Sequence, residues 1–89
     1  MNKKELERIE KMVLSAREGP WKSFIEGRDH ESGCSFIMVG GENNRGDDIE
    51  LSGATKADQD FIAFARQAVP ALIAEVRRLK VELKKSRNS

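Results

Sequence analysis

The sequence predicts an α+β fold: an N-terminal helix, a three-stranded antiparallel meander, and a long C-terminal helix kinked or broken at Pro70. Apolar residues recur at steps of three and four near both ends, as in helices that bury one face. Between them, short apolar runs are separated by turns rich in Gly, Asn and Asp. The length of 89 residues allows one domain. We assign residues 1–83 to this single α+β domain and residues 84–89 to a frayed basic tail.

The first helix is predicted over residues 3–17. Its apolar positions lie on one face, with Lys and Glu on the other, and they are Leu6, Ile9, Met12, Val13 and Ala16. Gly19-Pro20 ends the helix, because proline disfavours helical geometry at the preceding residue.

Three strands are predicted in the middle of the chain, over residues 21–26, 34–39 and 49–52. The second is a continuous apolar run between glycines, which favours a strand covered on both faces. Cys34, at its start, is expected to be a buried and inert thiol. The third alternates apolar and polar residues, as a half-buried strand does. A meander is the simplest way to connect them.

The C-terminal helix carries the longest apolar pattern. Thr55 followed by Asp58 is typical of a helix N-terminus. Beyond Pro70 the apolar spacing is that of a heptad repeat, with two valines and a leucine at a and leucine at d. β-branched a positions with leucine at d favour two parallel strands. We predict an oligomer interface at Val69, Leu72, Val76, Leu79 and Leu83. Glu75 would reach Lys80 of a partner chain; the alternative is that the stripe packs within its own subunit.

Charge is distributed unevenly although the whole chain has a net charge of only +1. Residues 28–60 hold three basic and eight acidic residues, a net charge of −5, whereas residues 61–89 hold seven basic and two acidic residues, a net charge of +5. The acidic middle and basic tail can attract each other or a partner, or serve only as solvated surfaces. A nucleic-acid partner is disfavoured, because the tail has no interleaved aromatic residues.

Several function classes are excluded by the residue inventory. One His and one Cys provide no zinc site and no nucleophilic pair, and no phosphate-binding glycine motif is present. We therefore expect no catalytic residues, no metal and no cofactor, and conclude that the protein is not an enzyme. No run of about 18 apolar residues or signal peptide is visible, so no membrane association is expected. The single cysteine indicates a reducing compartment, which places the protein in the cytoplasm.

The remaining candidates bind rather than react. A planar guanidinium can hold a phosphate or carboxylate with two parallel hydrogen bonds, and an indole can stack on a base or fill the core. A surface histidine can contact a phosphate. The predicted ligand-binding residues are Arg66, Arg45, Trp21, Arg28 and His30. For Arg66 the alternative is a structural ion pair with Asp60 or a loop acid, and for Trp21 it is burial in the core.

Two motifs carry a resemblance to a known family. Gly19-Pro20-Trp21 follows the first helix, and Asp60-Phe61-Ile62-Ala63-x-Ala65-Arg66 is followed by Val69-Pro70-Ala71-Leu72-Ile73-Ala74-Glu75-Val76-x-x-Leu79. Together they resemble the Ead-like early proteins of tailed phages. Arg17 and Glu18 replace a Thr and a Pro of that pattern, and Gln67-Ala68 stands where Asn-Asp is common.

The resemblance implies an accessory protein of a phage or prophage, in the cytoplasm of an infected bacterial host. Small proteins of that setting inhibit or sequester host defence components, and some trap nucleotide signals between subunits. Our leading hypothesis is a homo-oligomeric sponge for a nucleotide-derived immune signal, a small anionic ligand. The alternative is a protein–protein inhibitor of a host defence or regulatory protein, using the acidic loops between Arg28 and Glu50.

Overall fold

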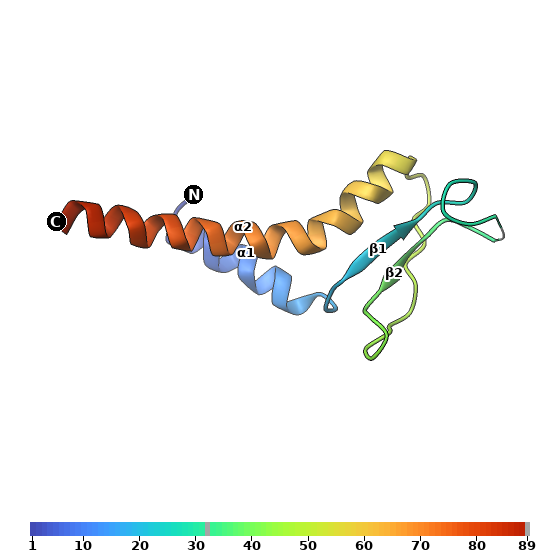
Figure 1. The fold of residues 1–89 in the computed structure, drawn as a ribbon, viewed down its shortest axis with the longest axis horizontal. Coiled ribbons are helices and arrows are strands. Elements are labelled where there is room, and N and C mark those ends of the chain that lie inside the picture. Colours follow the sequence, from blue (N-terminus) through green and yellow to red (C-terminus); the bar gives the residue numbers. More distant parts are fainter. Residues whose placement is uncertain (32, 89) are drawn as a thin grey trace.

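The computed structural model describes residues 1–31 and 33–88, so Ser32 in a predicted turn and Ser89 in the predicted tail lie outside it. The chain forms helix α1 (Lys3–Ser15), strands β1 (Trp21–Phe24) and β2 (Phe36–Val39), and helix α2 (Lys56–Asn88). This is the predicted α+β class. The molecule is elongated, with extents of 59 × 26 × 20 Å, because α2 runs along most of its length (Figure 1).

Helix α1 begins at a side-chain cap. The Asn2 Oδ1 atom accepts a hydrogen bond from the Glu5 backbone N–H at 2.8 Å, which satisfies a donor that the first turn leaves free. The helix ends at Ser15, two residues before the predicted end, and Ala16 has extended backbone geometry. Leu6 is the buried residue of α1, which packs antiparallel against α2. The prediction of a helix here is confirmed.

The sheet has two antiparallel strands, and the prediction of three is wrong. Trp21 pairs with Val39 and Phe24 with Phe36. The third predicted segment, residues 49–52, makes a single bridge: Ile37 and Ile49 exchange two backbone hydrogen bonds, of 2.8 and 2.9 Å. The chain then turns toward α2, so no ladder follows. The alternation of apolar and polar residues matches a strand, but it does not say how many of those residues pair with a neighbouring strand.

The hairpin has one covered face and one open face. Ile37 and Val39 are buried, whereas Phe36 and Met38 alternate with them and are half-exposed. The expectation that this strand is covered on both faces is therefore wrong, because only alternate residues of the strand are buried. Cys34 lies before the strand and is exposed, so the expected buried thiol is also wrong.

Helix α2 begins at the predicted cap and continues through Pro70 without a break. Thr55 Oγ1 accepts from the Asp58 N–H, and Asp58 Oδ2 accepts from the Thr55 N–H, both at 3.0 Å. Figure 1 shows the helix axis bending between its yellow start and its orange middle. The helix reaches Asn88 and therefore includes residues 84–88, which the sequence assigns to a tail.

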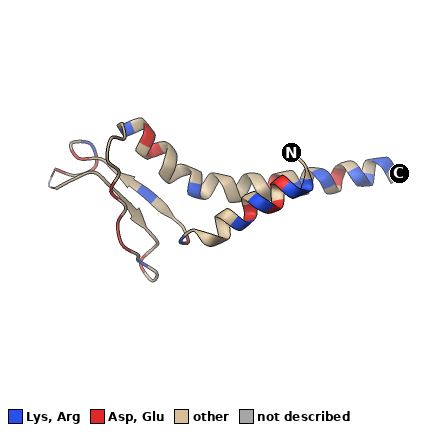
Figure 2. Ribbon diagram, turned by 180° about the vertical axis from the view of Figure 1, so that it is seen from behind, with Lys and Arg blue, Asp and Glu red and all other residues tan. Residues whose placement is uncertain are grey.

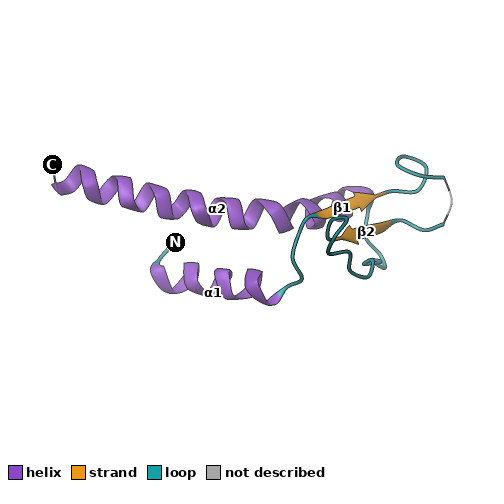
Figure 3. Cartoon of the chain, turned by 60° about the horizontal axis from the view of Figure 1, so that its bottom comes forward, coloured by secondary structure: helices purple, strands orange, loops and turns teal. Residues whose placement is uncertain are grey.

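A small core lies where the three parts meet. Its buried apolar residues come from the inner face of the hairpin, from α1 and from α2, and they are Leu6, Ile25, Ile37, Val39, Ala63 and Ile73. The charge asymmetry is visible in space: the acidic residues of the middle segment lie in the loops at one end, and basic residues dominate the other end of α2 (Figure 2). Figure 3 shows α2 extending past the first residue of α1.

Candidate functional site

An apolar groove lies between α1 and α2, beside the start of β1. Its volume is about 380 Å³, within the range of small-molecule sites. The α1 wall is formed by Ile9, Met12, Val13 and Ala16. The α2 wall is formed by Ile62, Ala65 and Val69. The groove forms because each helix presents an apolar face to the other, while the hairpin keeps them apart at this end.

Trp21 and Arg66 are the polar members of the groove, and both are half-buried. The Nε1 atom of Trp21 and the Nε atom of Arg66 are fully shielded from solvent. Among the described residues neither nitrogen has a hydrogen-bond partner. A buried donor without an acceptor costs roughly 1–3 kcal/mol. Two such donors beside one groove would gain from an acceptor of another molecule, which would reach them once the Trp21 or Arg66 side chain moved toward the groove.

Gln67 holds Trp21 in place from the neighbouring face of α2. Its Oε1 atom accepts from the Trp21 N–H at 2.8 Å, and its Nε2 atom donates to the Trp21 carbonyl at 3.0 Å. The same nitrogen donates to the Ala63 carbonyl at 3.2 Å. A Cβ at Gly19 would come within 3.2 Å of Gln67 Oε1 and 3.5 Å of Arg66 Cγ. The chain before Trp21 therefore approaches α2 closely because Gly19 has no side chain.

Gln59 performs the same task at the other end of the hairpin, and it is only 4% exposed. Its Nε2 atom donates to Ser23 Oγ at 2.9 Å, to the Phe36 carbonyl at 3.1 Å and to the Phe24 carbonyl at 3.2 Å. One amide thus joins both strands to α2. Sequence reasoning missed both glutamines. A signal was available for Gln59 alone, an uncharged amide on the apolar face of the helix, where it requires partners; Gln67 is exposed.

Arg28 is held by two carboxylates. Its Nη1 and Nη2 atoms donate to the two oxygens of Asp60 at 2.7 and 3.0 Å, and Nη2 and Nε donate to Asp29 Oδ2 at 2.8 and 3.0 Å. The Arg28 guanidinium, together with a hydrogen bond from Ser23, lowers the pKa of Asp60 to about 2. Arg28 likewise lowers the pKa of Asp29, and the two acids raise the pKa of Arg28. The group fastens the β1–β2 loop to α2, and Asp60 is unavailable to Arg66.

Arg45 and His30 lie apart from the groove. Arg45 pairs with Asp48 at 2.6 Å in the loop after β2 and borders a separate cavity of about 440 Å³ that includes Lys22 and Met38 of the open sheet face. His30 lies in the β1–β2 loop, where its ring packs against Phe36 with centroids 5.5 Å apart. Of the five predicted binding residues, the structure brings together Trp21 and Arg66.

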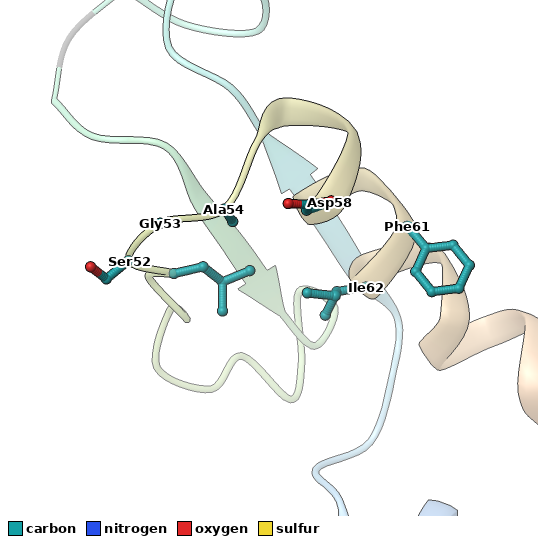
Figure 4. A pocket seen from close by; sticks show the side chains of 7 residues that line it. Ser52, Gly53, Ala54, Asp58, Phe61 and Ile62 are labelled. Atoms are coloured by element: carbon teal, nitrogen blue, oxygen red, sulfur yellow. The ribbon is translucent and has the colours of Figure 1, made fainter.

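A second cavity, of about 330 Å³, adjoins the groove at the start of α2 (Figure 4). Its lining includes Ser52, Gly53, Ala54 and Asp58, and the Asp58 carboxylate is already engaged in the helix cap. Ile62 borders both cavities. Figure 4 shows Ile62 directed toward the loop while the Phe61 ring stands out from the helix. The cavity is mainly an extension of the apolar surface.

The predicted interface residues follow α2 beyond the groove. Leu72 is 62% exposed, Leu79 50% and Leu83 55%, whereas Val69 and Val76 are half-buried beside α1. A cavity of about 210 Å³ lies on this face, between Leu6 and Ile9 of α1 and Val69 and Leu72 of α2. The alternative, that the stripe packs entirely within its own subunit, therefore applies only to the residues that α1 reaches.

Comparison of the chain with protein-family models, with curated proteins and with solved structures finds no match. Within residues 1–31 and 33–88, no group of three or more His, Cys, Asp or Glu side chains is placed to hold a metal ion. In the same part of the chain, neither helix combines the length and apolarity needed to cross a membrane.

Proposed function

We propose that this protein is a non-enzymatic phage accessory protein that binds and sequesters a small anionic ligand carrying a planar ring, best matched by a nucleotide-derived immune signal of the bacterial host. The observation that carries the proposal is the pair of buried, unpartnered donors in one apolar groove, Trp21 Nε1 and Arg66 Nε. The phage setting comes from the sequence resemblance.

The chemistry of the groove supports capture of such a ligand. The indole of Trp21 offers a face for stacking, and the guanidinium of Arg66 offers charged donors to a phosphate. Among the described residues, Arg66 has no ion pair, and the groove lining contains no carboxylate, imidazole or thiol. A phosphate would therefore meet a cation with no competing acid, and nothing beside it is suited to cleave it.

Titration of the full chain with cyclic dinucleotides, ADP-ribose and inorganic phosphate tests this proposal. Trp21 is the only tryptophan and the chain has no tyrosine, so its fluorescence reports on the groove directly. Arg66→Gln should weaken binding by roughly 10- to 150-fold, as expected for a charge-assisted hydrogen bond. Arg78→Gln is the matched control, because Arg78 pairs with Glu75 on the exposed side of α2 and should bind as the wild type does.

Two outcomes would contradict the proposal. The first is the absence of any binding signal across the panel, together with no small molecule released on denaturing protein purified from a host with active defence signalling. The second is equal weakening by Arg66→Gln and Arg78→Gln, which would mean that positive charge in general, and not the groove, attracts the ligand.

A second candidate is the protein–protein inhibitor, favoured by the exposed acids of the loop after β2. Glu42, Asp47 and Glu50 are exposed there and form no ion pair in the described part of the chain. These carboxylates would therefore be available to form ion pairs with a basic surface on a host protein. Capture of one host protein by the wild type, lost on replacing Asp47 and Asp48 with Asn and kept in Arg66→Gln, would favour this function over ligand capture.

A further inference from the structure

The apolar surface of α2 is longer than α1 can cover. The stripe of Val69, Leu72, Val76, Leu79 and Leu83 has alternating steps of three and four. The same steps extend it toward the helix start through Ala65 and Ile62. We call these seven residues the α2 stripe. At a rise of about 1.5 Å per residue it is roughly 30 Å long.

Adjoining cavities follow this stripe from Ile62 to Val76. The cavity of Figure 4 and the groove share Ile62, and the groove and the next cavity share Ile9 and Val69. The face is thus continuous from the start of α2 to the first turn of α1. Beyond Arg77, which pairs with Glu10 of α1, every described residue up to Arg87 is exposed, including Leu79 and Leu83. Figure 3 shows this overhang of α2.

The shape of the subunit also indicates a missing partner. The radius of gyration is 17.0 Å, whereas a compact chain of this length has about 12 Å. A domain of this size buries a smaller fraction of its surface than a larger domain does, roughly 60–65%. Among the described residues the buried apolar core has six members. A second helix layer on the stripe would supply the packing that a single copy lacks.

We propose that a second copy of this chain covers the α2 stripe, with the two α2 helices parallel and in register. The charges beside the stripe determine this orientation. With Val69, Val76 and Leu83 at heptad position a, Glu75 and Glu82 occupy g, and Lys80 and Arg87 occupy e. In a parallel pair each g residue faces the e residue five positions later on the other chain.

In that arrangement the charged residues that flank the stripe face residues of opposite charge on the other chain. Glu75 meets the partner's Lys80, and Glu82 meets the partner's Arg87, and the two-fold axis repeats both pairs. An antiparallel pair would instead bring g to g and e to e, acid against acid and base against base. Lys80, Glu82 and Arg87 form no ion pair in the described part of the chain. Glu75 binds Arg78 in an exposed pair of the same helix, which costs little to rearrange.

The same rule places an aromatic ring over the groove. Phe61 occupies g, is 73% exposed, and faces the partner's Arg66 five positions on. A ring over a guanidinium is a favourable cation–π arrangement. The partner subunit thus closes the groove that contains Trp21 and Arg66, and the ligand site is complete only in the dimer. This last step rests on the proposed function, whereas the dimer does not.

Charge exchange in the full chain tests the pairing. Glu82→Lys should weaken dimerisation roughly ten-fold, because two attractive pairs become repulsive, and Arg87→Glu should do the same. The double variant Glu82→Lys with Arg87→Glu should restore the wild-type dissociation constant. Native mass measurement over a concentration series gives these constants, and circular dichroism checks that each variant keeps its helices. All of these positions are exposed and outside the core.

Cross-linking tests the orientation. In a Cys34→Ser background, Leu72→Cys and Leu79→Cys, both at d, should each form a disulfide-linked dimer. An antiparallel pair can place at most one of them on its two-fold axis, so cross-linking at one position alone overturns the parallel arrangement. A monomer at all concentrations overturns the dimer, and single charge variants that dimerise like the wild type overturn the charge pairing that sets its orientation. Ligand binding by a monomer would refute this inference alone, and a dimer without ligand binding would refute the proposed function alone.

Discussion

Gln59 offers the sharpest test of how the fold is held together, through the variant Gln59→Glu. The change is isosteric, yet it replaces the Nε2 donor by a carboxylate oxygen that faces the carbonyls of Phe24 and Phe36. The Ser23 hydroxyl is not available as a donor to the new carboxylate, because it already donates a hydrogen bond to Asp60. The matched control is Gln59→Met, which removes the same donors without adding a charge.

The magnitudes follow from the burial and the bonds. Loss of the two amide N–H donors costs about 2 kcal/mol in Gln59→Met, at roughly 1 kcal/mol for each hydrogen bond. Gln59→Glu adds a buried charge with no cation beside it, which costs several kcal/mol more. A domain of this length has a free energy of unfolding of roughly 4–13 kcal/mol. The glutamate variant should therefore lose most of its stability at pH 7.

The dependence on pH separates the charge from the lost hydrogen bonds. Burial raises the pKa of the new carboxyl above its unfolded value of about 4.3, so the folded state binds the proton more tightly. The deficit of Gln59→Glu relative to Gln59→Met should shrink as pH falls from 7 and become constant below about 4.3. The Arg28–Asp60 pair survives this range, because the pKa of Asp60 is about 2. Urea unfolding at several pH values measures the deficit; an equal stability of the two variants at pH 7, or a deficit that grows on acidification, would refute the reasoning.

Two further predictions concern the loops. Gly40→Ala should cost about 3 kcal/mol or more, since φ is +84° and a Cβ would lie 2.1 Å from the Asn44 carbonyl oxygen. Gly27→Ala, at the same φ with open space around it, should cost about 1 kcal/mol; equal urea midpoints would show that the close approach is unimportant. Asp60→Asn should lower the urea midpoint at pH 7, because it removes the pair with Arg28. The pKa of Asp60 is depressed, so the advantage of the wild type is complete above about pH 4 and fades toward pH 2; an advantage that persists at pH 2 would mean that the carboxylate charge is not its source.

The local features of the fold were predictable from the sequence. The Thr55 and Asp58 cap and both helices depend on neighbours within a few positions, and the structure has them where the pattern indicates. The extent of the third strand was not predictable, because the alternation of apolar and polar residues at 49–52 matches a single bridge as well as a full ladder. The exposure of Cys34 likewise depends on where pairing begins, which the apolar run does not reveal.

The long-range polar contacts were beyond sequence reasoning. Arg28 and Asp60 are 32 positions apart, and Gln67 and Trp21 are 46 apart. Neither spacing has a periodicity that would connect the partners. For Trp21 the sequence is compatible with a place in the core and with a ligand site. The structure places it at the border of both, since its backbone is fixed by Gln67 while its ring lines the groove.

The arginines differ in availability for a reason that sequence neighbours explain in part. Arg45 has Asp48 three positions later, Arg78 has Glu75 three positions earlier, and each pair forms. Short spacing makes such pairing inexpensive, because little chain entropy is lost. Arg66 has Ile62, Ala63, Val69 and Pro70 at the corresponding positions, so its own helix offers no acid. Since Asp60 is taken by Arg28, Arg66 has no ion pair among the described residues, and on this availability the proposal of an anion in the groove depends.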